Sequence, residues 1–242
     1  MLSTSNYTIE NFNIYELEQT SSTNDALKEF PNLSPYTLIT ALTQTKGRGR
    51  RGRTWQSPKG NLYFSYSFII PIKDLNKLVF IISLSLAQTV KNISPSSQSI
   101  KIKWPNDVLL NNKKISGILL ENLKEDLWII GIGVNIVSSP KLTEVLYEAT
   151  SLQEEGIILD RIKFLHYYLK NFNKNYEIYT KEGFSKIKEQ WLEFAHNYHQ
   201  PINVKTEKEL KSGIFSAIDD NGYLILKTND KEEKIIAGDL FI

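Results

Sequence analysis

Cysteine is absent from this chain of 242 residues, and methionine occurs once. Without thiols there is no disulfide framework, no thiolate metal site and no cysteine nucleophile, which fits a reducing compartment. No apolar run approaches the ~20 residues that a membrane span requires, and the polar N-terminus carries no secretory signal. With 41% apolar and 23% charged residues the composition is that of a globular protein, so we expect a cytoplasmic location and no membrane partner.

Arginine is also scarce, and its distribution is uneven. Only five of the 29 basic residues are arginines, and four of these five lie between positions 48 and 53. A guanidinium offers a planar fork of donors that an ammonium lacks, so this concentration indicates a site for phosphate or carboxylate oxygens. The segment runs Gly47-Arg48-Gly49-Arg50-Arg51-Gly52-Arg53-Thr54-Trp55. Its glycines allow close backbone approach, and the tryptophan could stack on a planar base.

A nucleic-acid-binding module is the alternative that this loop leaves open. With Lys46 the loop carries five positive charges, whereas the whole chain has a net charge of +2, so the rest has −3. An extended basic surface is therefore not favoured.

The apolar spacing predicts a mixed α and β chain. We expect strands at 14–18, 36–43, 61–70, 100–103, 108–110, 114–122 and 127–136. Helices are expected at 25–30, 75–93 and about 159–198, the last divided at Gly183. The segment 44–59 is expected to be a long irregular loop. Short strands at 202–204, 211–218, 223–227 and 233–237 predict a small β-barrel, which gives two domains, 1–200 and 201–242.

Two further segments carry polar residues in tight turns. They are Lys103-Trp104-Pro105-Asn106-Asp107, followed by Lys114 and Gly117, and Gly131-Ile132-Gly133-Val134-Asn135. Taken alone, the first is equally well explained as a hairpin corner, and the second is better explained as a strand bulge.

In this order the segments resemble the catalytic domain of the biotin protein ligases. The resemblance also rests on Ser22-Thr23-Asn24, Gln44, Ser57-Pro58, Gly60-Asn61-Leu62 and Glu121, and on Gly213-Ile214, Ile218-Asp219 and Gly222 in the tail. It implies an α+β fold with a mixed β-sheet catalytic domain of the biotin/lipoate ligase type (class II synthetase-like), with helices on one side. A small C-terminal Src-homology-3-like β-barrel completes it.

The resemblance also implies an activity. Members of the family join biotin to ATP as biotinyl-5′-AMP and then transfer biotin to one lysine of a biotin carboxyl carrier domain, and ATP enters with Mg²⁺. By resemblance, the catalytic residues are Arg50, Lys114 and Arg48. The expected biotin-binding residues are Ser22, Thr23, Asn24, Gln44, Gly47, Arg48, Arg50, Lys114 and Gly117. The expected ATP- and adenylate-binding residues are Arg50, Arg51, Arg53, Trp55, Asn106, Lys114 and Asn135, and no metal ligand is assigned.

A lipoate or octanoate ligase on the same fold is the second alternative, which the polar set and the Arg-Gly loop do not favour. About 20 residues precede Ser22, too few for a DNA-binding helix-turn-helix domain, so no DNA partner is expected. Dimerisation is common in the family, and the resemblance allows a homodimer. His196 and His199 are expected at the surface rather than on a metal.

Overall fold

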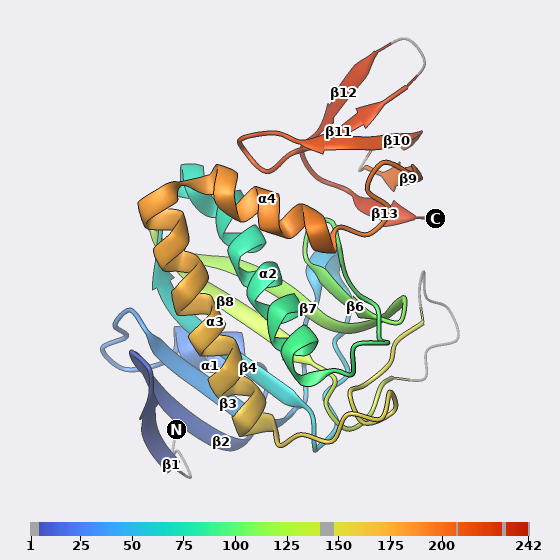
Figure 1. Cartoon of the computed structure of the whole chain (residues 1–242). Coiled ribbons are helices and arrows are strands. Elements are labelled where there is room, and N and C mark those ends of the chain that lie inside the picture. Colours follow the sequence, from blue (N-terminus) through green and yellow to red (C-terminus); the bar gives the residue numbers. More distant parts are fainter. Residues whose placement is uncertain (1–4, 141–147, 207, 229–230, 242) are drawn as a thin grey trace. The chain divides into compact units, whose positions relative to one another are not determined.

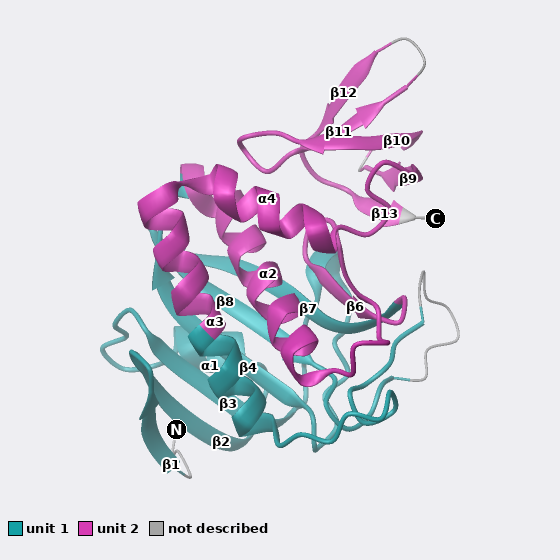
Figure 2. Ribbon diagram, viewed as in Figure 1, with its two compact units in different colours: residues 1–72, 113–170 teal, residues 73–112, 171–242 magenta. Residues whose placement is uncertain are grey.

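The computed structural model describes residues 5–140, 148–206, 208–228 and 231–241 (Figure 1). It divides into two compact units: unit 1 comprises residues 1–72 and 113–170, and unit 2 comprises residues 73–112 and 171–242 (Figure 2). The chain thus enters unit 2 twice, and helix α3 (Arg161–Glu182) runs from the first unit into the second.

The described residues of unit 1 form six strands and one short helix besides the start of α3. The elements are β1 (Ser5–Ile9), β2 (Phe12–Thr20), α1 (Thr23–Lys28), β3 (Thr37–Gln44), a 3₁₀ turn (Arg50–Gly52), β4 (Leu62–Ile69), β7 (Lys113–Lys124) and β8 (Leu127–Val134). The strands lie in the order β1-β2-β3-β4-β8-β7. Strands β2 and β3 are parallel and the other neighbours are antiparallel, so the sheet is mixed. Strand β1 was not predicted, and α1 begins two residues earlier than expected.

Both faces of the central strand β4 are buried, although helices were expected on one side of the sheet. On one face the Tyr66 hydroxyl lies 2.8 Å from that of Tyr168 on α3. On the other face Ser65 contacts Thr23 and Asn24 of α1. Because successive side chains of a strand point to opposite faces, α1 and α3 cover opposite sides of this sheet.

Unit 2 contains a helical layer, a hairpin and a small sheet. Its elements are a 3₁₀ turn (Ile72–Asp74) at the boundary, α2 (Leu75–Ile93), β5 (Ile100–Lys103), β6 (Asp107–Leu110), the end of α3, α4 (Phe184–Phe194), β9 (Pro201–Lys205), β10 (Leu210–Ile218), β11 (Leu224–Lys227), β12 (Glu232–Ile235) and β13 (Asp239–Phe241). Helix α2 packs on α4 through Phe80 and Trp191, whose ring centroids are 4.7 Å apart, and the Trp191 indole donates to Ser83 Oγ at 3.0 Å. Gly183, with φ +83°, separates α3 from α4, as predicted.

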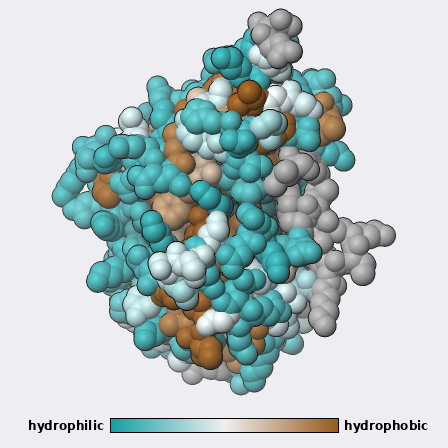
Figure 3. Space-filling view, turned by 45° about the vertical axis from the view of Figure 1, so that its right-hand side comes forward, coloured by the Kyte–Doolittle hydropathy of each residue, from teal (hydrophilic) through white to brown (hydrophobic). Residues whose placement is uncertain are grey.

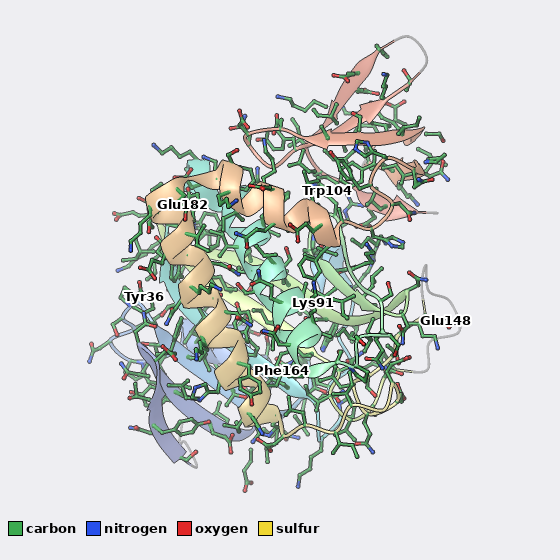
Figure 4. All side chains as sticks on the ribbon, viewed as in Figure 1. Tyr36, Lys91, Trp104, Glu148, Phe164 and Glu182 are labelled. Atoms are coloured by element: carbon green, nitrogen blue, oxygen red, sulfur yellow. The ribbon has the colours of Figure 1, made fainter. Side chains whose placement is uncertain are left out.

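The C-terminal strands form a separate antiparallel sheet in the order β12-β11-β10-β9-β13. The turn between β10 and β11 contacts the β5–β6 hairpin, because Trp104 Nε1 donates to the Gly222 carbonyl at 3.3 Å (Figure 4). The predicted fold class, a mixed sheet with helices and a small C-terminal sheet, is confirmed. The final strand, β13, was not predicted.

The molecule presents a mainly polar surface in the view of Figure 3. The face shown in Figure 3 is covered mainly by hydrophilic side chains, with hydrophobic ones in separate groups. Among the described residues, no helix combines the length and the apolar character that crossing a membrane demands.

His196 is only 9% exposed, so its expected surface position is wrong. Burial and the charges of Lys103 and Lys101 lower its pKa.

Candidate active site

The first turn of α1 holds the start of a hydrogen-bonded chain in unit 1. Thr23 donates to Gln44 Oε1 from its backbone nitrogen at 2.8 Å and from its hydroxyl at 3.2 Å. Gln44 Nε2 donates to Ser57 Oγ at 2.9 Å, and Ser57 Oγ donates to the Trp55 carbonyl at 3.1 Å. The N-cap residue Ser22 makes no side-chain capping bond. Gln44 thus ties the helix to the segment that follows Trp55.

Asn24 is the second polar residue of α1 with several partners. It is 3% exposed, and its Oδ1 lies 2.5 Å from the hydroxyl of Ser65, which is itself fully buried. Its Nδ2 donates to Glu121 on β7 at 2.9 Å. Gly131 lies directly beneath, where a Cβ would come within 3.0 Å of Asn24 Cγ and closer still to Oδ1. A side chain at position 131 would therefore displace Asn24.

Residues 47–55 form a small hairpin, called the Arg-Gly hairpin here, rather than the irregular loop predicted. Arg48 and Thr54 form an antiparallel bridge, and the Gly49 amide donates to the Arg53 carbonyl at 2.7 Å. The 3₁₀ turn sits at its tip, where Arg51 has φ 56°. Backbone bonds therefore give this arginine-rich segment a defined shape.

Arg48 is held by two carboxylates. Its Nη1 and Nη2 donate to the two oxygens of Asp25 at 2.5 and 2.7 Å, and Nη2 also lies 3.2 Å from Glu121. The hydrogen bond from Arg48 lowers the pKa of Asp25, and the same bond raises the pKa of Arg48. Burial acts to raise the pKa of Glu121, but hydrogen bonds from Asn24 and Lys28 and the charge of Arg48 outweigh it, and that pKa is lowered.

The other three arginines of the hairpin lie at its tip. Arg50 is half-buried, whereas Arg51 and Arg53 are exposed. Guanidinium groups at such a tip can reach an anionic ligand, and they can bind two of its oxygens at once.

Trp55 packs on a pair of glycines. Gly117 on β7 faces Gly133 on β8 in the sheet register. A Cβ at Gly133 would lie 2.5 Å from Trp55 Cε2, and one at Gly117 would lie 3.2 Å from Cζ3. The Lys114 ammonium stands 5.7 Å from the ring centroid. The indole nitrogen of Trp55 is buried without a hydrogen-bond partner. The glycines thus make room for the indole.

Asn135, directly after β8, donates two hydrogen bonds and has one acceptor atom, Oδ1, without a partner. Its backbone nitrogen donates to Ile115 at 2.8 Å, and Nδ2 donates to the Thr150 carbonyl at 3.0 Å. Its Oδ1 is buried and has no partner. Asn61 Oδ1 shapes the following turn by accepting from three successive backbone amides, those of residues 136–138.

Asn106 belongs to unit 2 and is described with that unit. It lies in the turn between β5 and β6, is 8% exposed, and follows the cis peptide bond between Trp104 and Pro105. The packed tryptophan expected for a hairpin corner is present, since Trp104 is 2% exposed.

The structure brings most predicted residues of unit 1 into two groups. The hydrogen-bonded group contains Thr23, Asn24, Gln44 and Arg48, and the second group contains Trp55, Lys114 and Gly117.

Sequence reasoning missed Asp25 and Ser65 and assigned no role to Glu121. The available signals were the position of Asp25 directly after Asn24 and a serine inside an aromatic strand. No group of three or more His, Cys, Asp or Glu side chains within the described ranges could hold a metal ion.

Two family models match separate parts of the chain. The model described as "Biotin/lipoate A/B protein ligase family" matches residues 16–135, and "Biotin protein ligase C terminal domain" matches residues 200–242. A biotin–[acetyl-CoA-carboxylase] ligase of Paracoccus denitrificans is 35% identical over 238 residues, covering 93% of this chain and 98% of that protein.

Two further comparisons agree with this result. The bifunctional ligase/repressor BirA of Bacillus subtilis is 35% identical over 217 residues, covering 86% of this chain and 67% of that protein. Among solved structures, the biotin protein ligase of Aquifex aeolicus in complex with biotin and ATP has a TM-score of 0.82 and 31% identity, covering 94% of this chain and 97% of that one.

Proposed function

The chain belongs to the biotin protein ligase family, and from this premise we propose that it is an ATP-dependent ligase that forms biotinyl-5′-AMP and transfers biotin to a lysine of a biotin carboxyl carrier domain. The observation that carries the proposal is the likeness along nearly the whole chain to a ligase whose structure holds biotin and ATP. Biotin and ATP are therefore its substrates, and Mg²⁺ is proposed to enter with ATP.

Charge is the main chemical problem of the first step. The biotin carboxylate must attack the α-phosphate, which brings two anions together, and fixed cations are the usual solution. We assign this role to Arg50, Arg51 and Arg53 at the hairpin tip, with Lys114 beside Trp55. Arg48, which was also expected to be catalytic, is proposed to act from its position between Asp25 and Glu121. Lys114 acts as a persistent cation near the mixed anhydride, because the nucleophilic amine comes from the acceptor protein.

Biotin's ureido group is neutral, and it suits neutral donors and acceptors. We propose that Ser22, Thr23, Asn24 and Gln44 supply these. Thr23 is bonded to Gln44 directly and is linked to Asn24 through Ser65, so the last three form a connected group. Such a group holds its donors in fixed directions before a ligand arrives. Gly47 and Gly117 are proposed to border the same ligand.

The nucleotide is assigned to Trp55, Asn106 and Asn135. The partnerless Asn135 Oδ1 suits an amine donor, such as the exocyclic amine of adenine. The Trp55 ring, which lies against Gly117 and Gly133, offers a face on which a base can stack.

The deciding measurement is exchange of labelled pyrophosphate into ATP by the purified protein with Mg²⁺ and biotin, run beside lipoate and octanoate. Exchange with biotin alone would support both adenylate formation and the substrate. Exchange with lipoate or octanoate would favour the second alternative. The absence of exchange with every acid, from a folded sample, would refute the ligase proposal and return the hairpin to the nucleic-acid hypothesis.

Four smaller expectations remain proposals. The acceptor is a biotin carboxyl carrier domain, testable by labelling with biotin and tryptic mapping of one lysine. The protein is cytoplasmic, testable by cell fractionation, and its C-terminal domain spans 201–242, testable by limited proteolysis. The resemblance also allows a homodimer, which sedimentation would reveal.

A further inference from the structure

Glu121, on β7, joins helix α1 to the Arg-Gly hairpin, and both are far from it in the sequence. Its carboxylate accepts from Asn24 Nδ2 at 2.9 Å, lies 3.0 Å from Lys28 Nζ and lies 3.2 Å from Arg48 Nη2. These partners come from the first turn of α1, the end of α1 and the Arg-Gly hairpin. We call this group the Glu121 hub.

The hub is electrically balanced. Two carboxylates, Asp25 and Glu121, stand opposite two cations, Arg48 and Lys28. The two carboxylates thus compensate the charge of Arg48 within the hub. A planar, two-pronged contact with Asp25 fixes the orientation of Arg48 as well as its distance.

Helix α1 holds the hairpin at both ends. At the entry, Asp25 and Glu121 bind Arg48. Past the exit, Ser57 accepts from Gln44, which itself accepts from Thr23. Because both attachments start in the first turn of α1, at Thr23 and Asp25, the position of the tip depends on them.

The side chains of these ion pairs are only partly buried. The side chains of Arg48, Asp25 and Glu121 are 35%, 32% and 23% exposed, so water partly screens their charges and limits what the pairs contribute to folding stability. Their loss should therefore change the geometry of the hairpin much more than the stability of the fold.

We propose that Glu121, acting with Asp25, is a positioning residue that sets the Arg-Gly hairpin against the polar end of α1 and so retains the adenylate. This inference rests on the proposed function. Glu121 need not touch the ligand: it acts through Arg48 and Asn24, and its effect should disappear when those partners are removed.

The test compares Glu121→Gln with Glu16→Gln as a matched control. Glu16 accepts from Arg161 at 2.6 Å in the same unit, with side chains 20% and 14% exposed, and its bond to Arg161 lies outside the hub. Both variants should lose only about 2–4 °C in Tm. E121Q should release labelled biotinyl-5′-AMP about ten to a hundred times faster than the wild type, whereas E16Q should match the wild type.

A double variant identifies the path of the effect. Adding E121Q to Arg48→Gln should increase adenylate release by less than E121Q does alone, because the partner is already missing. Glu121→Asp should restore part of the retention. If E121Q does not fold, Asp25→Asn takes its place, with the same expected result.

The outcomes separate the two proposals. A folded wild type without biotin-dependent pyrophosphate exchange refutes the proposed function itself. A wild type with normal exchange, beside an E121Q or D25N variant that retains adenylate as the wild type does, overturns only the positioning role. Equal losses in E121Q and E16Q would also overturn it, since they would show a general effect on the sheet.

Discussion

Replacing Gly131 by alanine tests how tightly the polar group is built. The new Cβ would lie within 3.0 Å of Asn24 Cγ and would overlap Oδ1, so Asn24 must move. Asn24 is 3% exposed, and it cannot move without losing its contact with Ser65 or its bond to Glu121. Overpacking costs about 1–3 kcal/mol and a lost hydrogen bond about 0.5–1.5 kcal/mol, so G131A should destabilise the protein by about 2–4 kcal/mol.

Urea unfolding of four proteins measures this cost: the wild type, G131A, Asn24→Ala and the double variant. In the N24A background the clashing atoms are absent, so adding G131A should cost less than about 1 kcal/mol. Gly49→Ala is the control, because its Cβ would meet only ordinary contacts, the nearest at 3.5 Å, and its φ is −111°. G49A should change stability by less than about 1 kcal/mol. An equal cost of G131A in both backgrounds would refute the reasoning.

Three further predictions concern charge and the C-terminal sheet. Arg48 lowers the pKa of Asp25 below its ordinary value of 3.8, so the pair contributes fully to the free energy of unfolding above pH 3.8 and loses this contribution as the pH falls through the lowered pKa. In Arg48→Gln, the free energy of unfolding should therefore fall less steeply at acid pH, as measured by urea unfolding at a series of pH values. Trp104→Phe removes the donor to the Gly222 carbonyl and should cost about 0.5–1.5 kcal/mol in the same assay, whereas an unchanged midpoint would contradict that role. Arg50→Gly should weaken adenylate retention and label lysines indiscriminately with biotin, and strict labelling of one acceptor lysine would contradict this.

Local patterns in the sequence predicted much of the fold. The glycine between two helical stretches predicted the break at Gly183, because only a residue without a side chain adopts φ +83° easily. The concentration of arginines predicted an anion-binding role for residues 47–55, because that chemistry depends on residue type. This role stays a prediction, and the hairpin that these residues form was not predicted. The buried second face of β4 escaped prediction, since it depends on α1, whose Thr23 and Asn24 lie 42 and 41 residues away from the Ser65 that they contact.

Tertiary structure alone decided which charges of the site are compensated. Asp25 and Glu121 lie 23 and 73 residues from Arg48, and nothing local separates them from ordinary surface acids. Likewise, the space that the Trp55 indole occupies exists only because the register of β7 and β8 places Gly117 opposite Gly133. Residue types and local spacing are properties of the chain, and they determined the chemistry available to this protein. Which groups meet depends on packing between distant segments, and that is decided only when the sheet and its helices assemble.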